Sequence, residues 1–209
     1  ICVCPKRFYQ ATILEDVLKN CWIGDPPANP QVAYEVSMKG LGKVDFVVAD
    51  IDPVEHLVRN FISVELQAVD LTGSVEPAYN AILNSTRLAT KPSHGINWAN
   101  VRKRYVSQLI SKGFFHHHWG TKIVAVMQSV LYAEFRKFIQ FDELTPAQGN
   151  IVFMLYDYEP DPERLSAHRL KLSRVVATSH NSLMMGSIYR TPPPREEFCQ
   201  KILDLIWAD

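Results

Sequence analysis

The sequence predicts an α/β fold in which a mixed central sheet is flanked by helices. Three observations support this class: strand-like apolar runs alternate with segments of helical periodicity, a hairpin joins the first two strands, and there is no internal repeat. The 209 residues are enough for one domain with a sizeable core. We therefore expect a single domain over residues 1–209.

The first part of the chain is predicted to form one helix and three strands. Residues 7–20 carry apolar side chains at helical spacing, and the Gly- and Pro-rich stretch 24–30 then forces a loop. The first two strands are joined by Gly40-Leu41-Gly42, which is typical of a hairpin connection. Alternation and β-branched residues predict the three strands at 31–39, 43–51 and 61–69.

The remainder is predicted to alternate helices with buried strands. Helical spacing favours one helix over 75–90, with Tyr79, Ile82 and Leu83 as its apolar set, and another that ends near Lys112. His116-His117-His118 make a poor three-ligand metal site, because adjacent residues point in different directions. They are expected in a surface loop between a helix and a strand. Further strands are expected at 121–127, 150–158 and 170–178, and a terminal helix at about 195–207.

Composition narrows the classes of function. The 22 Lys and Arg balance 22 Asp and Glu, which excludes a uniformly basic nucleic-acid binder but not a local basic stripe. The chain has no long uncharged apolar run, so no membrane span is expected. Four cysteines are too few for a disulfide scaffold and indicate a reducing compartment, for which we expect a cytoplasmic location.

Acidic residues interrupt the predicted strands. In 61–69, one face is wholly apolar, whereas the other carries Glu65 and Gln67. Asp45 lies in the neighbouring apolar strand, and Glu35 lies in the first strand. Exposure at an edge or a salt bridge is the simpler explanation for each acid alone. Together, Asp45 and Glu65 are placed to meet across the sheet and share a divalent cation.

The order of local motifs resembles the NotI-type restriction endonucleases, a branch of the PD-(D/E)xK nuclease superfamily. The most specific part is the segment around Glu65 to Ser74. The other matching segments are the Cys-Pro start at 3–7, the strand with Glu35, the strand with Asp45, and the segments 100–105, 126–130 and 151–155. One departure from the superfamily pattern is Gln67, which occupies a position where most members have Lys and this branch has Gln.

The resemblance implies a restriction-endonuclease-like core and Mg²⁺-dependent, site-specific hydrolysis of double-stranded DNA by a homodimer. It implies that Asp45 and Glu65 bind catalytic Mg²⁺, that Gln67 belongs to the same site, and that Glu35 is an additional acid. A neutral amide can orient a water molecule, but it does not supply the positive charge of a lysine.

The resemblance also implies a structural iron site held by cysteines. Cys4 matches the cysteine before proline, and Cys2 is a second candidate ligand for iron or zinc. The chain departs from the pattern because it opens at Ile1 without Met, so we expect upstream residues to supply the remaining ligands. Free buried thiols are the alternative for Cys21 and Cys199.

Candidate DNA contacts lie in two segments. Arg102, Lys103 and Arg104 form the densest basic run, which fits phosphate contact or, alternatively, a solvated helix face. Gln128 follows a buried strand, where it either reaches base edges or caps the strand end. Two other functions stay open at this point: a PD-(D/E)xK nuclease of DNA repair or processing, and a non-catalytic thiolate–metal binding module.

Overall fold

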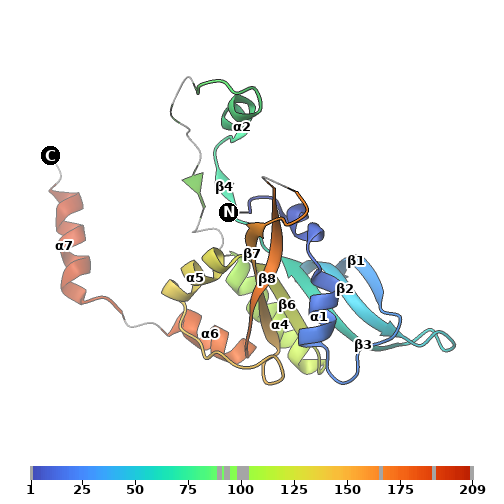
Figure 1. Cartoon of the computed structure of the whole chain (residues 1–209). Coiled ribbons are helices and arrows are strands. Elements are labelled where there is room, and N and C mark those ends of the chain that lie inside the picture. Colours follow the sequence, from blue (N-terminus) through green and yellow to red (C-terminus); the bar gives the residue numbers. More distant parts are fainter. Residues whose placement is uncertain are drawn as a thin grey trace.

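A six-stranded mixed sheet lies at the centre of the molecule, with helices on both faces (Figure 1). The computed structural model describes residues 2–88, 91, 95–97, 104–164, 167–189 and 192–207. β3, β6 and β7 are parallel, whereas the outer pairs are antiparallel, which confirms the predicted mixed α/β class. In order across the sheet, the strands are β1 (Gln31–Met38), β2 (Gly42–Ile51), β3 (Val58–Leu66), β6 (Lys122–Met127), β7 (Ile151–Pro160) and β8 (His168–Thr178).

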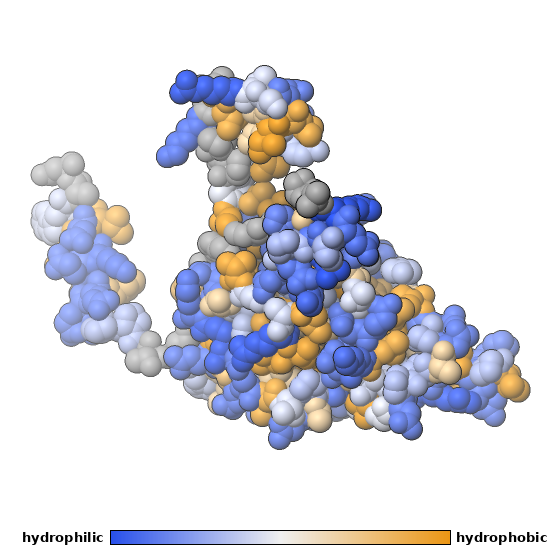
Figure 2. All heavy atoms as spheres, viewed as in Figure 1, coloured by the Kyte–Doolittle hydropathy of each residue, from blue (hydrophilic) through white to orange (hydrophobic). Residues whose placement is uncertain are grey.

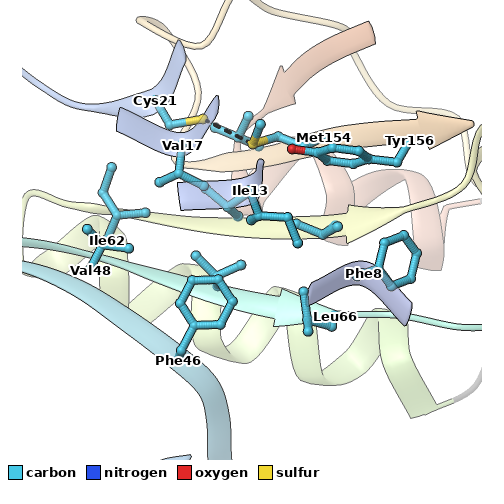
Figure 3. Packing of buried hydrophobic residues seen from close by; sticks show 14 of the residues in the cluster. Phe8, Ile13, Val17, Cys21, Phe46, Val48, Ile62, Leu66, Met154 and Tyr156 are labelled. Carbon is cyan, nitrogen blue, oxygen red and sulfur yellow. Dashed lines mark hydrogen bonds between the residues drawn. The ribbon is translucent and has the colours of Figure 1, made fainter. Parts of the chain in front are cut away.

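One face of the sheet is covered by the amino-terminal helices η1 (Pro5–Gln10) and α1 (Ile13–Cys21). Figure 3 shows Phe8, Val17 and Cys21 directed onto the side chains of the strands, among them Ile62. The predicted apolar face of β3 is buried in this cluster. Alternation therefore turns Ser63 and Glu65 towards the opposite face.

The opposite face is covered by α4 (Val106–His118), α5 (Ser129–Phe138) and α6 (His180–Ile188). Because helices cover both faces, every residue of β6 is buried. α4 lies close to the sheet at Gly113, where a Cβ atom would lie only 2.6 Å from Ile151 Cδ1. This close approach brings the neighbouring residues of α4 down onto the sheet.

Several predicted boundaries are wrong. The helix expected over 7–20 is divided, because Ala11 has extended backbone angles between η1 and α1. The strand expected over 61–69 starts and ends three residues earlier, so Gln67 lies beyond it. α4 continues to His118, so the three histidines lie on a helix and His116 is buried rather than in a surface loop. Sequence periodicity missed α5 and α6 altogether.

Two further helices extend from the body and expose apolar side chains. α2 (Glu76–Leu83) is shorter than the predicted 75–90 helix, and its expected apolar set is exposed, with Ile82 at 77%. α7 (Arg195–Ile206) confirms the predicted terminal helix and leaves Leu205 82% exposed. Figure 2 shows apolar surface on both helices, away from the sheet.

Two short strands, β4 (Leu71–Thr72) and β5 (Gly95–Ile96), pair with each other on either side of α2 in the sequence. Among the described helices, none has the length and apolar character needed to cross a membrane.

Candidate functional site

Three acids form a row across the first three strands. Phe46 of β2 pairs with Val64 of β3, and the next residues along these antiparallel strands are Asp45 and Glu65. The backbone N–H of Leu66 donates to Asp45 Oδ2 at 2.6 Å, which fixes this carboxylate against β3. The structure therefore brings Asp45 and Glu65 side by side, as the sequence predicts.

Glu35 completes the row at the edge of the sheet. It lies in β1 opposite Asp45, between the pairs that join Tyr34 to Phe46 and Val36 to Val44. Its φ of 55° is a left-handed conformation that is uncommon for glutamate, and its side chain is 65% exposed and pairs with Lys43 Nζ at 3.3 Å. Glu35 thus faces solvent, yet its charge raises the pKa of Asp45.

A buried lysine from α4 closes over the acid pair. The Lys112 ammonium donates to Glu65 Oε1 and, at 2.6 Å, to the backbone carbonyl of Lys43. The side chains of Lys112 and Glu65 are only 4% and 16% exposed. An ion pair shielded from water in this way interacts far more strongly than one on the surface.

The next turn of α4 fixes the helix against β3. His116 is fully buried, and its Nδ1 lies 2.7 Å from the carbonyl oxygen of Lys112. Because a carbonyl only accepts, Nδ1 carries the proton, and Nε2 accepts from the Ser63 hydroxyl at 2.7 Å. Burial lowers the pKa of His116 and favours this neutral form. The contact holds Lys112 in place over Glu65.

Asp45 and Glu65 repel each other, and both are partly shielded from water. Burial raises the pKa of Glu65 to about 7; Lys112 lowers this pKa, whereas the charges of Asp45 and Glu35 raise it. Burial also raises the pKa of Asp45, against the stabilising N–H of Leu66. A divalent cation between these carboxylates would favour their ionised forms.

Gln67 lies just beyond the end of β3, two residues after Glu65. Its backbone N–H donates to the carbonyl of Val126 at 2.8 Å, which extends the contact between β3 and β6. Its side-chain amide donates to the carbonyl of Ala68 at 2.6 Å. The amide is thus held by a local bond to the chain after β3, and it brings no charge.

Sequence reasoning places Tyr105 on the inner face of this helix but missed Lys112 as a residue of the site. Both lie on the inner side of the helical segment, seven residues apart, which is two turns of an α-helix. A lysine two turns after an inward-facing tyrosine was therefore the available signal. What the sequence could not show is that Lys112 lies over Glu65, 47 residues away along the chain.

The predicted DNA contacts fall in different surroundings. Arg102 and Lys103 lie outside the described residues, and Arg104 is exposed just before α4. Gln128 is buried, and its side-chain oxygen accepts the backbone N–H of Cys2. In this arrangement Gln128 ties the amino-terminal segment to the end of β6 and presents no amide to solvent.

The cysteines do not form a metal site within the described residues. Cys2 is buried and donates from Sγ to the Cys4 carbonyl at 3.2 Å, whereas Cys4 is exposed. Burial raises the pKa of Cys21 to about 12, as expected for an inert core thiol. No cluster of three or more His, Cys, Asp or Glu in the described part of the chain is arranged to hold an ion. These residues by themselves therefore do not fit a structural iron site, and a metal at the acid pair would take two protein carboxylates.

Comparison with known proteins gives a family match that covers most of the chain. The family model described as Restriction endonuclease NotI matches residues 1–172. This segment contains all three acids of the row and α4 with Lys112. No curated protein matches the chain.

Proposed function

Because the chain belongs to the NotI restriction endonuclease family, we propose that it is a Mg²⁺-dependent endonuclease that cuts double-stranded DNA at a specific sequence. The observation that carries the proposal is the juxtaposition of Asp45 and Glu65 beneath the buried Lys112 ammonium. We infer that the sheet is a core of the PD-(D/E)xK type, since the two acids lie at adjacent register positions on neighbouring strands.

The donor set suits magnesium. Mg²⁺ prefers oxygen ligands and is usually held by one or two carboxylates together with water and phosphate oxygens. Asp45 and Glu65 offer two carboxylates on one face, and burial disfavours their charged forms until a cation approaches. When bound, Mg²⁺ polarises a phosphoryl oxygen and lowers the pKa of an attacking water molecule.

The remaining side chains complete the chemistry of the site. The Lys112 ammonium orients Glu65 and supplies, from a helix, the positive charge that the neutral Gln67 lacks. Positive charge at this place offsets the repulsion between a phosphodiester and the acid row. The Gln67 amide is proposed to orient a water molecule, and Arg104, with Arg102 and Lys103, is proposed to contact DNA phosphates.

Incubation of a sequenced plasmid or genome with the purified protein and Mg²⁺ tests the proposal directly. We expect a small set of discrete fragments whose ends map to one recurring sequence, and no cleavage when EDTA removes the metal. A random ladder, or digestion from the ends, would instead favour a nuclease of DNA repair or processing. Metal binding without any cleavage would favour the non-catalytic binding module.

We further propose that the working enzyme is a homodimer. Symmetric cutting of both strands requires two active sites related by a twofold axis. The exposed apolar side chains of α2 and α7, such as Ile82 and Leu205, provide surface that an assembly would cover (Figure 2). We expect sedimentation at micromolar concentration to give twice the mass of the chain. A monomeric mass, measured on protein that cuts both strands at once, would contradict this proposal.

A further inference from the structure

Tyr105 holds a buried hydroxyl that has no partner in the described part of the chain. In the described residues, only two buried side-chain oxygens lack a hydrogen-bond partner, those of Tyr105 and Thr178. Tyr105 is 7% exposed and packs among apolar residues that include Val106 and Leu109. An unsatisfied buried hydroxyl destabilises the folded protein, so its retention requires an explanation.

The direction of α4 places Tyr105 beyond the acid pair. His116 contacts Ser63, and Lys112, one turn earlier, contacts Glu65, so α4 runs antiparallel to β3. Two turns before Lys112, Tyr105 therefore lies past Glu65, towards the segment that begins with Gln67. Its place in the same buried cluster as Val69 agrees with this position.

The surroundings of the hydroxyl are acidic. Burial raises the pKa of Tyr105 well above its ordinary value, and the charges of Glu65 and Asp45 raise it further, so the hydroxyl stays protonated and serves as a donor. Both carboxylates already accept hydrogen bonds, from Lys112 and from the N–H of Leu66. The Tyr105 hydroxyl donates to neither carboxylate, so it is available to an anionic oxygen that arrives from outside the chain.

We propose that the Tyr105 hydroxyl donates a hydrogen bond to an oxygen of the DNA phosphate that is cut at the Asp45–Glu65 pair. The inference rests on the proposed function, because it takes the scissile phosphodiester as its acceptor. In the free protein the hydroxyl is buried and unpaired. The proposed bond therefore requires that the side chains covering the hydroxyl shift when DNA binds. In this role Tyr105 is a catalytic residue that acts as a neutral hydrogen-bond donor and binds no metal.

The Tyr105→Phe variant tests the proposal through two readouts with opposite signs. The thermal unfolding temperature of the free protein should stay the same or rise, because the variant removes an unsatisfied buried hydroxyl. The single-turnover cleavage rate constant at saturating protein should fall about 100-fold, as when one donor to a developing negative charge is removed.

Tyr156→Phe is the matched control. Tyr156 is also buried, in the cluster on the other face of the sheet (Figure 3). Its hydroxyl, however, donates to Asp16 Oδ2 at 2.7 Å. This variant should lower the unfolding temperature and leave the cleavage rate unchanged. A Tyr105→Phe rate within about twofold of wild type, or a fall in both stability and rate, would overturn the role of Tyr105 alone. A wild-type protein that cuts no DNA would overturn the proposed function together with this inference.

Discussion

Replacement of Asp45 by asparagine is expected to reduce Mg²⁺-dependent cleavage by about 10³-fold or more, because the site loses one of its two carboxylates. The amide oxygen of asparagine can still accept the N–H of Leu66, so the junction between β2 and β3 should remain intact. The cleavage rate is measured with excess protein on a short duplex that carries the mapped site. Binding of the same duplex in Ca²⁺ reports whether the variant still recognises DNA.

Asp50→Asn provides the matched control for this prediction. Asp50 lies on the same strand, β2, and the chemical change is identical, but it pairs with Asn60 near the other end of β3. We expect the control to cut at the wild-type rate and to unfold at a similar temperature. Cleavage by Asp45→Asn at close to the wild-type rate would show that the acid pair is not the active site.

The sheet was largely predictable because its strands carry their pattern locally. β-branched residues and alternation mark β2 and β3, and the hairpin glycines mark the connection between β1 and β2. Helix ends were less predictable, since they depend on contacts made elsewhere. His116 has a polar side chain, yet Ser63 and the Lys112 carbonyl satisfy both ring nitrogens and allow α4 to bury it. In α2, by contrast, helical spacing correctly indicates a helix, but its apolar set is exposed in the structure.

The acids of the site were predictable for a related reason. A carboxylate inside an apolar strand is costly, so Asp45 and Glu65 stand out in the sequence without any structure. Lys112 does not, because lysine is common on helices and its ordinary position is in solvent. Its burial becomes visible only when α4 is placed over β3. The positive charge of the site thus comes from Lys112, which is distant in sequence from the strand motif that contains the acids.

The pair of Glu65 and Lys112 predicts a specific pH dependence of cleavage. Metal binding requires the Glu65 carboxylate, and its pKa of about 7 means that the ionised fraction rises as the pH increases through neutrality. We therefore expect the wild-type cleavage rate to rise through about pH 7 and then to level off. Lys112 lowers this pKa by its hydrogen bond and its charge. Removal of the ammonium must then move the rise to higher pH.

Lys112→Met tests that relation, since methionine fills similar space without charge. The midpoint of the pH–rate curve should move up by roughly one to three pH units, the usual effect of losing an adjacent opposite charge. The variant should also lose about 3 kcal/mol of unfolding free energy near pH 8, because Glu65 is left buried without its partner.

Lys122→Met is the control: Lys122 is another buried lysine, which donates to the carbonyl of Pro146. That control should leave the midpoint unchanged even if stability falls. A Lys112→Met midpoint equal to that of wild type would mean that Glu65 does not control the pH dependence of the reaction, because Glu65 is the carboxylate to which the Lys112 ammonium donates.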